Sequence, residues 1–193
     1  MREGAEAKLG GHPCISASLV KGGMMDTALS LGLIWSGLWM AYLYVIMKCF
    51  PWEMLHDYPE DVRRASTLPE PTGKQKRNAK IFSGIGSIII FGALILFGLL
   101  RFHAERADFL TLFWFLFIIA MSWNVIDLLV MDWLLVCTVR PAWLIIPGTE
   151  NCSSYSDYGY HFKGFLIGCI YTTIMALIFA GIDYAILRFL IWG

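Results

Sequence analysis

The chain has 193 residues, of which 58% are hydrophobic and only 16% are charged, and its formal net charge is zero. An ordinary soluble domain has about a quarter of its residues charged, so this composition argues against a water-soluble protein and indicates a bilayer protein. The balanced charge gives no reason to expect nucleic acid as a partner, and the length allows one compact unit.

Residues 1–23 form a polar tail without the apolar stretch that a signal peptide requires. Residues 21–23 read Lys-Gly-Gly, which a purine-rich ribosome-binding site could encode just ahead of Met24 and Met25. If the source is bacterial, we expect the native protein to begin at one of these methionines and the tail not to be native. The alternative, a genuine N-terminal tail, stays open.

Four windows are long and apolar enough to cross a bilayer, which takes about 20 residues in a helix. They cover residues 27–47, 81–100, 109–133 and 164–192. Tryptophans near several of the ends supply interfacial anchors. We therefore expect an all-α integral membrane protein in which residues 24–193 form a single bundle of four transmembrane helices.

The connection between the first two spans has a helix-compatible part and a proline-rich part. Tyr58 and Pro59, followed by two acidic residues, are typical of a helix start. Residues 70–73 then interrupt the chain before the basic stretch 74–80, which we expect to meet anionic lipid head groups. The sequence thus predicts a cytoplasmic helix and loop between spans one and two.

Lys and Arg are unevenly distributed between the two sides of the predicted bundle. The first and third loops hold Lys48, Arg63, Arg64, Lys74, Lys76, Arg77, Lys80, Arg140 and Lys163. The opposite side holds Arg101, Arg106 and Arg188, together with the basic residues of the tail. By the positive-inside rule we expect loops one and three in the cytoplasm and both termini outside, in a bacterial plasma membrane.

The third apolar run carries two carboxylates, Asp127 and Asp132, close to Asn124. As an α-helix, residues 109–139 would be about 46 Å long, whereas the hydrocarbon core is about 30 Å thick. At 100° per residue the two acids would lie about 140° apart, with Asn124 between them. An ionised Asp at the centre of a membrane helix costs about 2.5–3.5 kcal/mol, so we expect at least one acid to face protein.

Cationic groups on the same side are candidate partners for these acids. Arg140 follows Asp132 by about two helical turns and precedes Pro141, so a direct pair needs the chain to bend back. His161 and Lys163 would approach from the start of the last span. One interpretation is an ion pair that locks helices three and four together. The other is a polar binding cavity at the cytoplasmic end of helix three, lined by Asn124, Asp127, Asp132, Arg140 and His161.

Asp183 is a third acid within an apolar run, and it lies five residues before Arg188 on the last span. Residues five apart on an α-helix are about 140° apart, which is a poor geometry for an ion pair. We therefore expect its partner on another helix. The groups at a suitable depth are Arg101, His103 and Arg106.

Residues 142–146 are apolar but too short to span a bilayer, and prolines bracket them. We expect an interfacial or re-entrant piece, or a short strand over the cytoplasmic mouth. The tyrosines that follow, Tyr155, Tyr158 and Tyr160, form either an interfacial aromatic belt or the rim of a substrate site.

Small residues recur at every fourth position of the last span. They are Gly164, Gly168, Thr172, Ala176 and Ala180. Because lipid supplies little hydrophobic drive between helices, such a stripe favours close helix packing. We expect a packing seam within the bundle or between protomers, with room for a substrate beside the glycines as the alternative.

Motifs for cofactor or nucleotide chemistry are missing from the sequence. It contains no HExxH, GxSxG or Walker loop, and the four histidines show no i,i+4 pair on one helix. The five cysteines show no CxxC and no regular spacing, which is not the pattern of a disulfide frame. We therefore expect neither a metal nor a cofactor.

These features favour a solute- or ion-binding, transport-type membrane protein that acts as a homo-oligomer, since four helices leave little room for a complete pathway. One alternative is a structural or accessory subunit that its small-residue stripes dock to a partner membrane subunit. A second alternative is an enzyme acting on lipid head groups, with Asp127 or Asp132 and His161 as acid and base. Of these three interpretations, the sequence favours the enzyme least.

Overall fold

The computed structural model describes the chain from Pro13 to Gly193, with side-chain positions from Gly23 onward. This part of the chain forms helices and no strands, which confirms the predicted all-α fold. Four helical stretches are long and apolar enough to cross a membrane: Gly23–Cys49, Gly73–Phe102, Phe109–Val139 and Tyr158–Ile191. The question of the native start falls on residues 1–23, of which 1–12 lie outside the described residues.

The element order is that of a four-helix bundle with short helices in its two larger loops. The first two spans belong to α1 (Pro13–Cys49) and α4 (Gly73–Phe102). The third is α5 (Phe109–Ile126), continued by the π-helix η2 (Asp127–Val139), and the fourth is α6 (Tyr158–Ile186), continued by the π-helix η4 (Leu187–Ile191). The loops contain α2 (Pro51–Met54), η1 (Leu55–Asp57), α3 (Glu60–Ala65) and η3 (Ser153–Ser156).

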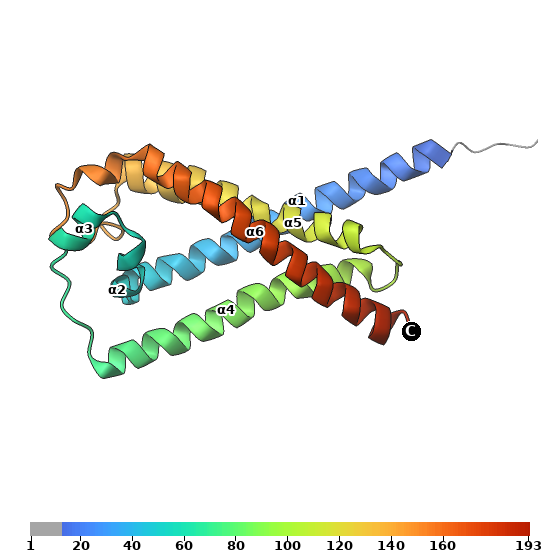
Figure 1. Cartoon of the computed structure of the whole chain (residues 1–193), viewed down its shortest axis with the longest axis horizontal. Coiled ribbons are helices and arrows are strands. Elements are labelled where there is room, and N and C mark those ends of the chain that lie inside the picture. Colours follow the sequence, from blue (N-terminus) through green and yellow to red (C-terminus); the bar gives the residue numbers. More distant parts are fainter. Residues whose placement is uncertain (1–12) are drawn as a thin grey trace, which may run out of the picture.

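The long helices cross near the middle of the molecule and separate toward one end (Figure 1). α5 packs most extensively against α1 and α6 and is therefore the central helix. The first half of α4 diverges from the first half of α6, and α2 and α3 lie at this end (Figure 1). We refer to it as the loop end.

Backbones approach closely where the helices cross. A Cβ atom on Gly32 of α1 would overlap the Ser122 hydroxyl of α5 and lie 3.5 Å from the Ile119 Cα. Phe115 and Leu116, fully buried on α5, lie in the same core. Since tight packing rather than hydrophobic drive associates helices in lipid, contacts of this kind fix where the helices cross.

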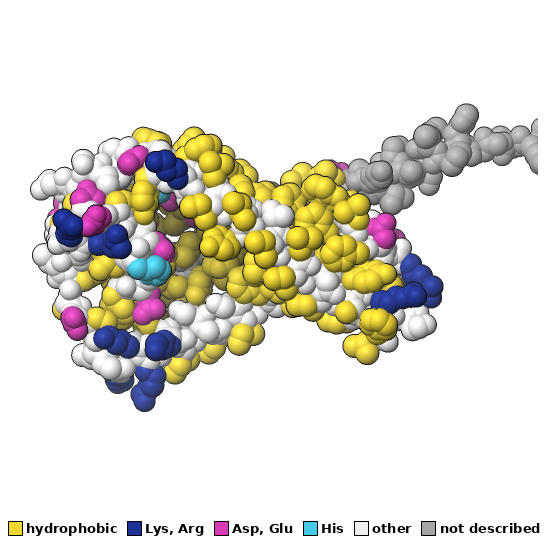
Figure 2. Space-filling view, viewed as in Figure 1, with side chains coloured by type: hydrophobic (Ala, Val, Ile, Leu, Met, Phe, Trp, Pro, Cys, Tyr) yellow, Lys and Arg dark blue, Asp and Glu magenta, His cyan; other side chains and the backbone are white. Residues whose placement is uncertain are grey.

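The outside of the bundle is apolar. Ile88, Phe189 and Leu190 are 74%, 77% and 78% exposed. Figure 2 shows hydrophobic side chains covering the middle of the molecule, while Lys and Arg gather toward its two ends. An apolar surface of this extent would be unstable in water, so the four helices belong in a bilayer.

The apolar segment 142–146 folds over the loop end as a turn, so the predicted alternative of a short strand is wrong. Leu144 and Ile146 are only 2% and 1% exposed. The Tyr58 hydroxyl donates to the Leu144 carbonyl at 3.1 Å, and the Ile146 N–H donates to the Tyr155 hydroxyl at 3.2 Å. Burial raises the pKa of the Tyr58 phenol above its ordinary value, which keeps this donor protonated.

The helix α3 joins the two large loops. Val62 is fully buried in the core of the loop end. The Ser154 hydroxyl donates to the Asp61 carboxylate, and this hydrogen bond lowers the pKa of Asp61 below its ordinary value. The loop between spans one and two is thereby tied to the loop before α6.

Asp183 of α6 does not form the interhelical ion pair expected from the sequence. It is fully buried, and neither carboxyl oxygen has a hydrogen-bond partner among the described residues. Arg101 pairs with Glu105 instead, at 3.0 Å, and Arg106 donates to a carbonyl near the C-terminus. The Asp183 carboxyl lies against Gly98 of α4, where the two helices approach closely.

We expect Gly98→Ala to lower the free energy of unfolding by about 1–3 kcal/mol, the usual effect of overpacking. The new methyl group would lie 3.0 Å from the Asp183 Cγ and 3.3 Å from the Leu116 Cδ2. Denaturant titration in detergent micelles measures the change. Gly92→Ala is the control, because a Cβ at Gly92 of the same helix meets nothing within 4 Å.

A double variant, Gly98→Ala with Asp183→Ala, tests whether Gly98 packs against Asp183. Asp183→Ala removes the group that the new methyl meets, so the double variant should lose less stability than the sum of the two single changes. Strictly additive losses would show that the two residues do not pack on one another.

Candidate functional site

A cavity of about 620 Å³ lies at the loop end. Its walls come from α1, the α2–η1 connection, α5 with η2, the loop before α6, and α6; none of its lining residues belongs to α4. Figure 2 views the bundle from the side and shows the hollow facing the viewer, so the cavity opens between helices. Much of its wall is apolar and includes Leu43, Met47, Leu128 and Met131.

Asp127 and Asp132 share the cavity because the third span changes its backbone hydrogen bonding at Asp127. In η2 the N–H groups donate to carbonyls five residues earlier, as the Arg140 N–H does to Leu135 at 2.8 Å. Residues five apart therefore lie about one turn apart along the same face. The expectation of about 140° between the two acids, which assumes an α-helix, is wrong, and both line the cavity.

Asp132 pairs with His161, which the chain brings to it from the start of α6. The His161 Nδ1 lies 2.9 Å from the Asp132 Oδ1, and the side chains are 13% and 26% exposed, respectively. An ionised carboxylate can only accept, so the His161 Nδ1–H donates to Asp132 and Nε2 points away from the pair. That Nε2 is buried and has no hydrogen-bond partner among the described residues.

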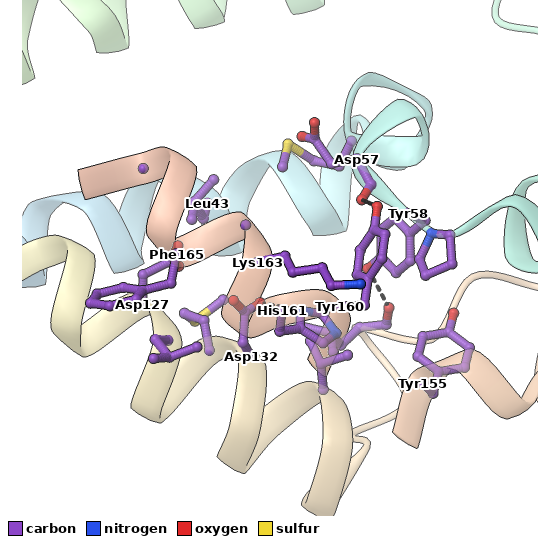
Figure 3. A pocket seen from close by; sticks show the side chains of 18 of the residues that line it. Leu43, Asp57, Tyr58, Asp127, Asp132, Tyr155, Tyr160, His161, Lys163 and Phe165 are labelled. Carbon is purple, nitrogen blue, oxygen red and sulfur yellow. Dashed lines mark hydrogen bonds and ion pairs between the residues drawn. The ribbon is translucent and has the colours of Figure 1, made fainter. Parts of the chain in front are cut away.

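Asp127 also lines the cavity, but its carboxyl group has no hydrogen-bond or ion-pair partner within the part of the chain that the structure describes. It is half-buried, on the cavity side of the third span. Figure 3 shows it at one side of the cavity, beyond Asp132. An isolated carboxylate in a membrane segment is costly, so Asp127 is the polar group of the cavity that the protein itself leaves without compensation.

Asn124 forms the inner end of the polar surface. Its amide nitrogen donates to the Phe165 carbonyl at 3.5 Å and to the Cys169 Sγ at 3.3 Å. It thus joins α5 to α6 one turn further from the loop end than Asp127.

Arg140, the remaining candidate from the sequence, is not among the cavity-lining residues. Its backbone is left-handed, with φ at 52°. Its guanidinium donates to the Ser156 hydroxyl and, at 3.5 Å, to the Cys137 carbonyl. Arg140 therefore ends η2 and holds the following loop, and the candidate pair with Asp132 does not form.

The small-residue stripe of α6 has two different environments. Ala176 and Ala180 are fully buried in the core at the helix crossing, and Thr172 is half-buried. A Cβ at Gly168 would lie 2.6 Å from the Asn124 Oδ1, whereas one at Gly164 would meet nothing within 4 Å. The inner part of the stripe packs against other helices, and Gly164 opens onto the cavity.

The loop between spans one and two supplies cavity residues that sequence reasoning did not assign to the site. His56, Asp57 and Tyr58 all line it. Asp57 pairs with His56 at 3.1 Å, and its carbonyl accepts from the Tyr160 hydroxyl at 3.1 Å. The sequence around Tyr58 predicted only the start of a helix. Such a local pattern does not say which other segments the Tyr58 side chain contacts.

No protein-family model, curated protein or solved structure matches the chain. Among the described residues, no three His, Cys, Asp or Glu side chains gather closely enough to hold a metal ion. The function is therefore inferred from the shape and chemistry of the cavity.

We expect Gly168→Ala to destabilise the protein by about 1–3 kcal/mol, because the added methyl group must displace the Asn124 amide. Gly164→Ala is the matched control, with the same substitution in the same stripe and open space around it. Thermal unfolding in detergent micelles measures both variants. Equal effects would contradict the close contact between Gly168 and Asn124.

Proposed function

We propose that this protein binds an amphiphilic small molecule in the cavity at the loop end and acts as a binding or transport-type membrane protein. The observation that carries the proposal is the Asp127 carboxylate, which lines a largely apolar cavity without a protein partner. A ligand that brings a cationic or hydrogen-bond-donating group would satisfy it. Apolar walls beside a few polar groups are typical of small-molecule sites.

The distribution of Lys and Arg supports a cytoplasmic position for the cavity. The loops that close it are the first and third, which hold most of the basic residues outside the tail. The same proposal places both termini on the outer side of a bacterial plasma membrane. Beyond Asn124, the packed helix crossing closes the bundle, so transport through the membrane would require a second copy or a partner subunit.

We expect Asp127→Asn to lose a ligand that wild-type protein retains when it is extracted gently from native membranes. Losing the charge should weaken binding by about tenfold or more, since truncating one partner of a buried charge pair typically costs over 1.4 kcal/mol. Native mass spectrometry measures occupancy. Asp26→Asn is the control, because Asp26 is exposed on α1 and does not line the cavity.

Two results would contradict the proposal. Wild type and Asp127→Asn carrying the same ligand would remove the assigned role of Asp127. A ligand-free protein bound to a partner subunit would favour the accessory role, especially if Gly168→Leu abolished that association and Asp127→Asn did not.

The Asp132–His161 pair supports a second candidate function, an enzyme acting on lipid head groups. A carboxylate that orients a histidine through Nδ1 leaves Nε2 to accept a proton from water or a substrate hydroxyl. The contact at 2.9 Å and the unpartnered Nε2 support this candidate, which requires a substrate to reach the buried Nε2.

The enzymatic candidate predicts turnover of phospholipid by the reconstituted protein. His161→Gln should lower the rate by about 10²–10⁴-fold, the usual contribution of general acid–base catalysis. Mass spectrometry of the lipids measures the products. Wild-type protein that leaves the lipids unchanged over long incubation would rule this candidate out.

A further inference from the structure

Two opposite charges remain unpaired in the cavity. The ionisable side chains that line it, apart from its tyrosines, are His56, Asp57, Asp127, Asp132, His161 and Lys163. Asp132 pairs with His161 and Asp57 with His56. Asp127 and Lys163 form no ion pair, with each other or with another described group. The cavity therefore presents one free carboxylate and one free ammonium.

The two charges lie at different places in the cavity. Asp127 is one turn further into the bundle than Asp132. Lys163 extends toward the side of Tyr58 and Tyr160, near the loop end, as Figure 3 shows. A ligand that satisfies both groups must carry a cation toward the inner end and an anion near the loop end. A zwitterion has this chemistry.

The cavity opens on the side of the bundle, where Figure 2 shows a hollow. α6 lines one edge, α4 contributes no lining residue, and the first halves of these helices diverge (Figure 1). Along α6 the cavity extends from Tyr160 to Gly168, about 12 Å at 1.5 Å per residue. A length of about 12 Å fits within one leaflet, since the hydrocarbon core of a bilayer is about 30 Å thick. A molecule of that leaflet can therefore place its polar group inside and leave its acyl chains in lipid.

The surroundings of the opening favour an anion at its outer end. The first turns of α4 carry Lys74, Lys76, Arg77 and Lys80, all exposed. Figure 2 shows basic side chains beside the hollow. Basic residues next to a membrane helix attract lipid phosphates. The carboxylate of Asp127 can only accept, so it favours an ammonium with N–H groups over a fully methylated one.

We propose that the cavity receives the head group of a phospholipid with a primary ammonium, of the phosphatidylethanolamine class, from the surrounding leaflet. The ammonium pairs with Asp127 and the phosphate with Lys163. This inference rests on the proposed function, because it names the class of ligand for the same cavity.

The test measures binding of three added lipids with identical acyl chains by native mass spectrometry of the full chain. They are phosphatidylethanolamine, phosphatidylcholine and phosphatidylglycerol. Wild type should prefer phosphatidylethanolamine by about tenfold, the equivalent of one favourable charge contact. Asp127→Asn should abolish its advantage over phosphatidylglycerol, while Lys163→Gln should weaken both lipids. Asp26→Asn and Lys48→Gln are the charge-matched controls, since neither residue lines the cavity.

Equal binding of the three lipids, or a preference that both variants keep, would overturn the inference. If soluble phosphoethanolamine bound as tightly as the lipid, the inference that the ligand is a lipid from the leaflet would be wrong. A different ligand retained from native membranes and lost in Asp127→Asn would overturn the phospholipid assignment while supporting the proposed function. If Asp127→Asn retained every ligand that wild type binds, both the phospholipid assignment and the proposed function would be wrong. Thermal unfolding confirms that each variant is folded.

Discussion

The third span must satisfy its backbone hydrogen bonds within itself, because lipid offers no alternative partners. The rest of the site depends on how it does so. From Phe109 to Ile126 the span is α-helical, and from Asp127 to Val139 it is a π-helix. Both forms pair the backbone internally, but they place side chains on different faces. π-Helical segments are rare and are frequently found at functional sites. Here the change aligns Asp127 with Asp132, and the second acid then meets His161.

The cavity exists because the helices are held close together at one level and separate at another. At the crossing, Gly32 and Gly98 let neighbouring side chains approach the helix backbones. Toward the loop end the first half of α4 diverges, and the loops only partly fill the space. Tyr58 and Asp61 attach the first loop to the segment before α6. The result is a closely packed half and an open half that contains the cavity and its polar groups.

The charges of the open half divide into satisfied and unsatisfied groups. Asp132 and His161 contact each other, whereas Asp127 and Lys163 form no ion pair among the described residues. In a soluble protein water would solvate such groups at little cost, but beside lipid an unpaired charge is expensive. Buried Asp183 differs, because it packs against Gly98 and does not line this cavity. Asp127, Asp132 and Asp183 thus have distinct surroundings, although all three lie within apolar runs.

By itself the sequence determined the four helices, their approximate limits and the residues that suggest a polar site. These follow from composition and local hydropathy, since a span is defined by its own residues. The sequence also singled out Asn124, Asp127, Asp132 and His161, because polar groups in a span are costly wherever the helix packs. Only the tertiary structure decided which of them meet. An α-helix would place the two acids on different faces, whereas the π-helix brings both to the cavity. The Arg140 side chain contacts Ser156, and His161 contacts Asp132 from another helix. Such contacts join residues far apart in the chain, and their energies depend on a geometry that no local pattern contains.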